Sequence, residues 1–261
     1  MTAAGSEELK RALAPDQIGF VLDKLELLAF RTTFDPQTKK GLVPINTSII
    51  DVDQFESTLK VVRPVIKAKL AVSHLIGIAR EGEKIGSVVV PTGKVGLATI
   101  CSVAVNGVLL KAGIPIESRF GGVLEIRERV PHRFIALISY AGTSLDPSEQ
   151  YIRARMTSVS EVAATGSGTI LANFREIPAP ARALVNEKIN QMKTAGIDAV
   201  YRLGNTGEPV CQIAVGLNRV GLVNIGGLNP MAAAVEEGIP VENIAESGLA
   251  EYAQLTSIWE L

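Results

Sequence analysis

The hydrophobic and polar positions of the chain follow two kinds of pattern. Segments in which apolar residues alternate with polar ones, or run without a break, predict strands. Those segments are residues 25–30, 42–51, 133–142 and 168–177, with shorter ones at 71–79, 85–90, 198–203 and 210–215. Residues 118–130 add one further strand to the first half of the chain.

Apolar residues spaced three and four apart predict two equivalent helices. The first begins near Asp53 and turns inward Phe55, Leu59, Val62 and Ile66. The second opens at residues 178–179 and turns inward Leu184, Ile189 and Met192. A buried strand followed by a buried helix then closes each half, and Gly113 and Gly238 end those helices. A short helix with Ser6 as its N-cap is predicted before the first strand.

The chain contains an internal duplication. At an offset of 125, residues 94–117 align without a gap on residues 219–242, and eight of the 24 positions are identical. The same offset pairs Ile45 with Ile170 and Leu59 with Leu184. Upstream the offset falls to 111, which indicates an insert of about fourteen residues in the second copy, within 151–168.

The duplication predicts the fold class and the domain organisation. We expect an α/β (α+β) protein made of two tandem, pseudo-symmetric repeats that bury their apolar faces against each other in one two-lobed domain. The first repeat is expected at residues 1–130, with the short N-terminal helix, and the second at 131–261, with the insert.

Composition and charge narrow the function classes. The 26 basic and 27 acidic residues leave a net charge of −1, which argues against direct nucleic-acid binding by this chain. Two cysteines and two histidines make neither a disulfide framework nor a four-ligand zinc site. The longest uncharged stretches, 95–110 and 220–235, are too short and too interrupted to span a membrane. We therefore expect a metal-free protein of the cytoplasm.

Motifs for catalysis are absent from the sequence. It has no GxSxG elbow, phosphate-binding loop, HExxH pair or CxxC pair, and His74 and His132 lie far apart. No enzymatic activity and no cofactor are expected.

The starts of the two equivalent buried helices form the first candidate ligand site. Small or hydroxylated residues there expose backbone N–H groups at the positive end of a helix dipole, which suits an anion. The candidates are Thr99, Cys101 and Ser102 in the first copy and Gly226, Gly227 and Asn229 in the second. Ser102 or Asn229 could instead cap its own helix, the glycines could serve tight packing, and Cys101 could be a small buried apolar residue.

A second candidate group lies around the insert. Thr143 and Ser144 follow a predicted strand, and Asn173 and Arg175 are two residues apart on another strand, so they share a face. Arginine binds a carboxylate through two parallel hydrogen bonds. Structural ion pairs of Arg175 or Arg153 with Glu176 or Glu149 are the alternative.

Six stretches resemble the regulatory domain of the archaeal nitrogen-regulatory repressor family, NrpR. They are KVGLATICSVAVNGVLLKAGIP, RFGGVLEI, AGTSLDPSEQYI, MTSV, GSGTILANFREIP and RVGLVNIGGLNPMAAAVEEGI, and the resemblance covers residues 18 to 258. It implies an effector-sensing domain of a transcriptional repressor whose operator binding is weakened by 2-oxoglutarate. In that family a winged helix-turn-helix segment precedes such domains, whereas this chain is expected to have no DNA-binding head.

The resemblance also implies partners. A small dicarboxylate effector is expected in a closed cleft between the two copies, lined by the ten candidate residues above. High hydropathy and a charged fraction of only 20% favour a homodimer, or assembly with a DNA-binding subunit of the NrpR type. Two alternatives stay open: a headless oligomerisation partner without a ligand, and an enzyme acting on a small carboxylate.

Overall fold

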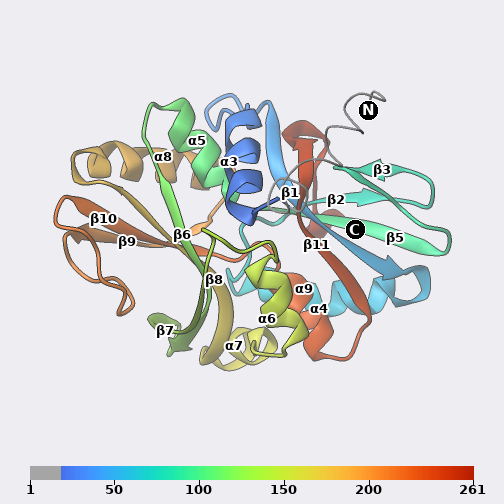
Figure 1. Ribbon diagram of the computed structural model, residues 1–261. Helices are drawn as coiled ribbons and strands as arrows, with labels where there is room; N and C mark the ends of the chain where they lie inside the picture. The colour runs from blue at the N-terminus through green and yellow to red at the C-terminus, as the bar shows by residue number, and fades with distance from the viewer. Residues whose placement is uncertain (1–18) are drawn as a thin grey trace, which may run out of the picture.

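Two five-stranded antiparallel sheets, flanked by helices, form the protein in a computed structural model that describes residues 19–261 (Figure 1). The first sheet has the order β11-β1-β5-β2-β12, and the second has the order β7-β6-β8-β10-β9. We call each sheet with its helices a lobe. The mixed α/β class predicted from the sequence is confirmed.

The strands of the first sheet are β1 (Leu42–Asp51), β2 (Leu75–Ala79), β5 (Lys94–Ile100), β11 (Val241–Glu251) and β12 (Thr256–Ser257). Those of the second are β6 (Glu117–Arg127), β7 (Val130–Ser139), β8 (Gly168–Pro178), β9 (Val200–Thr206) and β10 (Arg219–Ile225). A small hairpin is formed by β3 (Lys84–Ile85) and β4 (Val88–Val89). The helices are α3 (Val21–Arg31), α4 (Phe55–Lys67), α5 (Val103–Lys111), α6 (Pro147–Arg153), α7 (Val159–Thr165), α8 (Arg182–Thr194) and α9 (Asn229–Glu236). Four single turns of 3-10 helix complete the set: η1 (Val52–Gln54), η2 (Ala179–Ala181), η3 (Tyr252–Gln254) and η4 (Ile258–Glu260).

The lobes exchange one strand each. Strand β6 follows α5 of the first copy but pairs with β8 of the second sheet, and β11 follows α9 of the second copy but pairs with β1 of the first. The predicted boundary at 130/131 falls at the start of β7, inside the second sheet. The sheets and the two sequence copies therefore have different boundaries.

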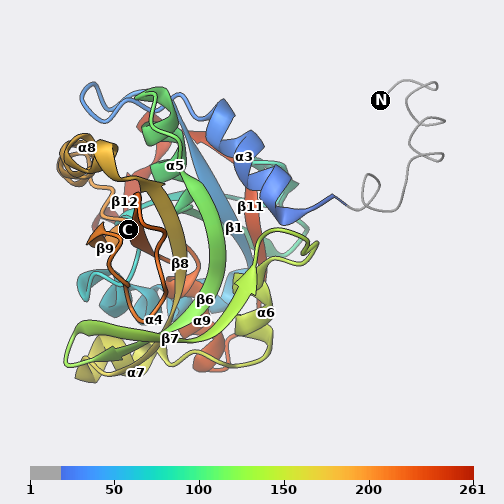
Figure 2. The ribbon, with the colours of Figure 1, turned by 60° about the vertical axis from the view of Figure 1, so that its left-hand side comes forward.

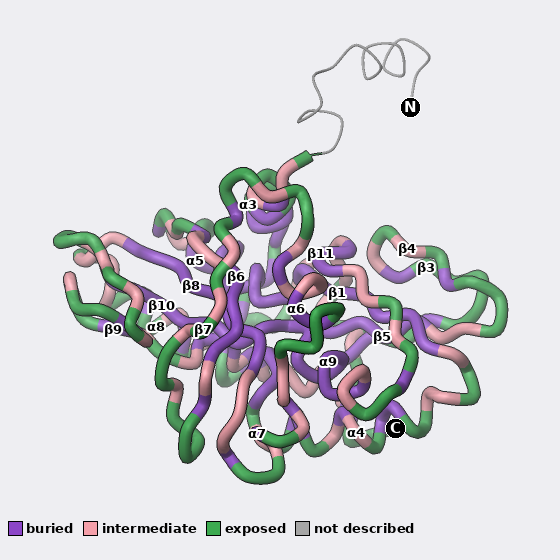
Figure 3. The backbone as a smooth tube through the Cα atoms, turned by 60° about the horizontal axis from the view of Figure 1, so that its bottom comes forward, coloured by how far each residue is buried: buried purple, intermediate pink, exposed green. Residues whose placement is uncertain are grey.

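The hydrophobic core is shared between the lobes for the same reason. One buried cluster joins Leu59 of α4 to Phe174 of β8 and Met231 of α9, and another joins Ile45 of β1 to Ile189 of α8. Helix α4 packs on α9, and α5 packs on α8. Figure 3 shows the buried backbone in the middle of the molecule, where β1, β6 and α9 lie, with exposed loops around it.

Three of the predicted strands and one predicted core residue are wrong. Residues 85–90 form the end of β3, a turn and β4 rather than one strand. Residues 25–30 lie in helix α3, because Val21, Leu25 and Leu28 have helical spacing that a six-residue window hides. Residues 210–215 form only an isolated bridge, between Val210 and Ile213. Leu184 of α8 is 39% exposed, and Val185 is buried in its place. The predicted N-terminal helix at Ser6 lies outside the described residues.

The offset of 125 between the copies holds for only part of the chain. Ile45 pairs with Ile100 and Ala172 with Ile225, so the residue equivalent to Ile45 is Ala172 rather than Ile170. Helix α4 likewise begins at Phe55 and α8 at Arg182, 127 residues later. The first copy therefore has two extra residues between α4 and β5. An ungapped comparison at an offset of 125 misaligns the residues before them by two positions.

Candidate functional site

The two equivalent strand-to-helix turns meet at the junction of the lobes. The Thr99 hydroxyl donates a hydrogen bond to the Gly227 carbonyl (2.9 Å), which joins the turn after β5 to the turn after β10. A Cβ atom on Gly227 would stand 3.0 Å from the Ile100 carbonyl oxygen and 3.2 Å from Cys101 Cα. One on Gly226 would stand 2.9 Å from the Leu171 carbonyl oxygen. Both glycines thus allow close packing, as the packing alternative predicted: Gly227 against the opposite lobe, and Gly226 against β8 of its own sheet.

Ser102 receives two side chains of the opposite sheet. The Asn173 side-chain amide donates to Ser102 Oγ (3.0 Å), and Arg175 donates through Nη2 to the same oxygen (3.1 Å) and through Nη1 to the Ser102 carbonyl (2.8 Å). Ser102 stands at the N-cap of α5, yet its side chain makes no capping hydrogen bond. The capping alternative for Ser102 is therefore wrong.

Arg175 is a buried cation that makes no salt bridge with a carboxylate of residues 19–261. It is 1% exposed, and its Nε has no hydrogen-bond partner within residues 19–261. Glu176 pairs instead with Arg119 (3.0 Å) and Arg219 (3.4 Å). Burial lowers the pKa of the Arg175 guanidinium. The predicted ion-pair alternative is wrong for Arg175, although Glu149 does lie 3.7 Å from Arg153.

Tyr140 completes the junction on the side of β7. Its hydroxyl donates to Asn173 Oδ1, and burial raises its pKa well above 10. Burial also raises the pKa of the neighbouring Cys101 thiol to about 12. A thiol with this pKa is protonated at neutral pH, so Cys101 has the properties of a buried apolar side chain rather than a nucleophile.

Two carboxylates that the sequence did not single out lie beside this network: Glu246, which is buried, and Asp146, which is half-buried. Burial first, and then the neighbouring Asp146 carboxylate, raises the pKa of Glu246 to about 8. Burial raises the pKa of Asp146 itself to about 6. Glu246 comes from the exchanged strand β11, and its charged residue type gave no signal of burial.

Helix α3 covers the junction. Its apolar residues Val21, Leu25 and Leu28 cluster with Cys101 and Tyr140. The helix is fastened at its start by the backbone hydrogen bond from Val21 N–H to the Thr143 carbonyl (2.9 Å). The buried network therefore has a helical cover that belongs to the N-terminal side of the chain.

The remaining predicted site residues lie apart from Arg175. The Thr143 hydroxyl makes a local turn with the Leu145 backbone, and Ser144 is exposed. Asn229 is completely buried, and both atoms of its side-chain amide bond to the backbone of Leu171 (2.8 and 3.0 Å). Of the ten candidates, the structure brings together at the junction Thr99, Cys101, Ser102, Asn173, Arg175, Gly226 and Gly227.

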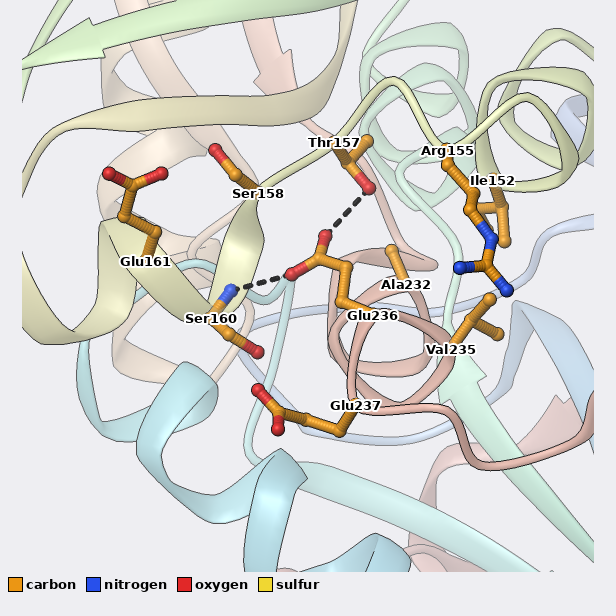
Figure 4. Close-up of a pocket in the computed structure, with 10 residues that line it drawn as sticks. All are labelled: Ile152, Arg155, Thr157, Ser158, Ser160, Glu161, Ala232, Val235, Glu236 and Glu237. Carbon is orange, nitrogen blue, oxygen red and sulfur yellow. Dashed lines mark hydrogen bonds between the residues drawn. The ribbon is translucent and has the colours of Figure 1, made fainter.

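A separate cavity of about 420 Å³ lies between α9 and the linker of α6 and α7 (Figure 4). Three of its donors are occupied, because the Glu236 carboxylate accepts hydrogen bonds from the Thr157 hydroxyl (2.7 Å) and from the N–H groups of Val159 and Ser160 (2.9 Å each). The hydrogen bonds of Glu236 thereby hold the residues of the predicted insert against α9. Because Glu161, Glu236 and Glu237 line this cavity against the single guanidinium of Arg155, it is a weaker candidate for an anion than the junction.

Comparison with known proteins places the chain in a family. Residues 18–257 match the family model described as NrpR regulatory domains NRD1 and 2. The chain belongs to this family. It is 37% identical to the global nitrogen regulator NrpRI of Methanosarcina mazei, over 99% of this chain and 79% of that protein.

Two further relatives carry the name global nitrogen regulator NrpR. The chain is 29% identical to the one from Methanocaldococcus jannaschii and to the one from Methanococcus maripaludis, and it spans 41% and 43% of their lengths. A crystal structure of a nitrogen repressor-like protein from Methanococcus jannaschii has a TM-score of 0.77 and 27% identity, covering 92% of this chain and 99% of that one. The chain is thus a regulatory domain of the nitrogen-repressor type.

The NrpR-type domain has no long apolar helix in the part of the chain that the structure describes. None of the helices within residues 19–261 reaches the length and hydropathy needed to cross a bilayer.

Proposed function

We propose that the chain is the effector-sensing regulatory domain of a repressor of nitrogen-assimilation genes in the cytoplasm, and that its effector is 2-oxoglutarate. Family membership and the names of its relatives support the regulatory role. The choice of a dicarboxylate effector is supported by the chemistry of the junction between the lobes.

The observation that carries this proposal is the buried guanidinium of Arg175, which forms no salt bridge in the described part of the chain. A buried charge without a counter-charge is costly, and removing that cost is what an anionic ligand does on binding. A carboxylate of 2-oxoglutarate would pair with the guanidinium, whose Nε has no partner in the described chain. Ser102, Asn173 and Tyr140 add polar atoms to the same network.

Helix α3 gives the bound effector a route to the rest of the molecule. It covers the Arg175 network, so a ligand that enters there favours arrangements in which α3 is displaced. A ligand shifts a conformational equilibrium by its difference in affinity for the two states. We propose that displacement of α3 is the change that 2-oxoglutarate produces.

Isothermal titration with 2-oxoglutarate tests the proposal. Wild-type protein is expected to bind it, and Arg175→Lys to bind at least tenfold more weakly, because lysine cannot form the two parallel hydrogen bonds. The matched control is Arg127→Gln, since Arg127 is exposed and pairs with Glu125 at 2.8 Å far along β6. Thermal melting checks that each variant is folded.

Two results would reject the proposal. Absence of heat at millimolar 2-oxoglutarate removes this effector altogether. A folded Arg175→Met variant with wild-type affinity removes Arg175 from the site, because methionine has no charge with which to hold a carboxylate.

An assembly role is the second candidate, and the edge strand β7 favours it, although its Phe134 N–H bonds to the Cys211 carbonyl (3.3 Å). Within the second sheet β7 pairs only with β6, and its Val130, Ile135 and Leu137 side chains are 53%, 48% and 41% exposed. An apolar edge strand is a surface on which another chain can add strands. We propose a homodimer, or an assembly with a DNA-binding NrpR-type subunit, through this edge. The mass from light scattering, compared with that of an Ile135→Lys variant, tests it.

A further inference from the structure

A hollow of about 540 Å³, distinct from the Arg175 network, lies between α3, the turn after β7, α6 and β11. Figure 2 shows α3, β11 and α6 on the same side of the molecule. Part of its wall is apolar and is formed by Phe20, Val21, Leu27 and Leu145. Its charged lining consists of four acids and two bases: Asp23, Asp146, Glu149, Glu246, Lys24 and Arg153.

The two bases of the hollow make only long contacts with its acids. Lys24 Nζ donates to the Ala245 carbonyl (2.8 Å) and stands 4.0 Å from Glu246 Oε2, beyond hydrogen-bond distance. Arg153, with a side chain that is 72% exposed, stands 3.7 Å from Glu149. The hollow therefore keeps an excess of negative charge.

Glu246 is the unusual member of this lining. Its side chain is only 5% exposed, and its carboxylate makes no hydrogen bond with any residue between 19 and 261. The backbone holds it there in a left-handed conformation (φ 52°), and its N–H donates to Asn46 Oδ1 (3.0 Å). Asp146 uses Oδ1 to accept the Glu149 N–H (3.0 Å) at the start of α6. Buried carboxylates are normally paired, so this carboxylate calls for a partner.

A proton or a bound cation can neutralise such a pair of acids. Burial raises the pKa values of Glu246 and Asp146, and repulsion from Asp146 adds to the first and repulsion from Glu149 to the second, which agrees with incomplete neutralisation of the two acids. Within residues 19–261, no group of three or more His, Cys, Asp and Glu side chains has an arrangement that could hold a metal ion. An organic cation fits a hollow that combines carboxylates with an apolar wall.

We propose that this hollow binds a small aliphatic amine, with its ammonium group against the Glu246 and Asp146 carboxylates and its carbon chain along the apolar wall. An ammonium group has three N–H donors and no acceptor, which matches the Glu246 carboxylate, because that carboxylate accepts no hydrogen bond from residues 19–261. The apolar wall selects an alkyl amine over the bare ammonium ion, because burial of each methylene group adds to binding.

Titration calorimetry at pH 8 with n-butylamine and with putrescine tests the inference. Wild-type protein is expected to bind both amines. The uncharged 1-butanol, which has a similar shape, is expected to bind at least tenfold more weakly. Glu246→Gln keeps the size of the side chain and removes its charge, so it is expected to weaken amine binding at least tenfold. The control is Glu26→Gln on the exposed face of α3, with an expected change below twofold.

Three results would overturn it: no heat with either amine, equal binding of 1-butanol and n-butylamine, or equal amine affinities of Glu246→Gln and Glu26→Gln. If Glu246→Gln fails to fold, Asp146→Asn takes its place with the same expected loss. The titrations are made without 2-oxoglutarate, so failure here leaves the Arg175 test unaffected.

Discussion

The two strand-to-helix turns at the junction occupy equivalent places in the duplicated fold but differ in chemistry. After β5 the turn carries Ser102, which accepts hydrogen bonds from Arg175 and Asn173 of the opposite sheet. After β10 the equivalent position is Gly227, which has no side chain and lies against the backbone of the first turn. The turn after β5 therefore binds side chains of the opposite sheet, whereas the turn after β10 lets the backbones of the two lobes come close together.

The strands facing these turns show the same difference. Arg175 pairs with Leu222, and the equivalent Ser48 pairs with Leu97. Ser48 is neutral and donates to Asn243 Oδ1 (2.7 Å), so the first lobe has no counterpart of the buried cation. Duplication thus supplied two similar positions, of which only one became charged. A single effector site is what this asymmetry favours.

The largest expected effect on stability comes from adding a side chain at Gly227, in the turn after β10. Gly227→Val places a branched side chain against the Ile100 carbonyl and Cys101 Cα, and should lower the free energy of unfolding by about 3 kcal/mol, as overpacked cores do. Urea unfolding measures it. The control is Gly142→Asn, because Gly142 faces open space and asparagine tolerates its positive φ. Equal stability of the two variants would refute the close-packing role of the second turn.

A smaller effect on stability is expected from removing the Ser102 hydroxyl, in the turn after β5. Ser102→Ala removes the acceptor of Asn173 and of Arg175 Nη2 and leaves buried donors unpaired, which costs about 2 kcal/mol. Ser48→Ala at the equivalent of Arg175 removes one hydroxyl donor and should cost about 1 kcal/mol. Urea unfolding of both variants gives the difference. Similar losses would mean that the two sides of the junction are equally important for stability.

The last expected effect is a pH dependence from Glu246, which is spread over several pH units and has no counterpart in the other half of the duplicated fold. Its pKa is raised from 4.5 to about 8, so its contribution to stability is complete below pH 4.5 and is lost as the pH rises through 8. The slope cannot exceed about 1.4 kcal/mol per pH unit for one group. Asp146, Glu149, Lys24 and Arg175 are the charged groups that act on it.

Stability measured by urea unfolding between pH 6 and 8 should fall for the wild type and change less for Glu246→Gln, which cannot ionise. The Glu26→Gln variant should keep the wild-type slope. A wild-type curve that rises over this range, or slopes that do not differ, would contradict the raised pKa.

The sequence predicted most of the local structure and part of the site. The ungapped repeat located both strand-helix pairs, and strand spacing placed Asn173 and Arg175 on one face, where they meet Ser102. The helix at 21–31 was missed because the short apolar run fits two periodicities. The membership of β6 and β11 in the sheets could not be predicted, because it depends on pairing between distant segments.

The buried acids were missed for the same reason. Glu246 is buried only because β11 crosses to the first sheet, and nothing in its local sequence marks that crossing. Thr143 and Ser144 have the right hydroxyl chemistry but stay on an outer turn. Residue type and spacing therefore identified donors that act within one strand or turn, but not groups assembled by the exchange of strands.

The reciprocal crossing of β6 and β11 also sets an order of assembly during protein synthesis. All five strands of the second sheet lie between Glu117 and Ile225, whereas the first sheet pairs Leu42 with Glu251 and closes with Ser257. A nascent chain leaving the ribosome can therefore complete the later lobe while the earlier one still waits for its edge strands. The lobe whose first strands are translated earlier is thus the one whose sheet is completed later.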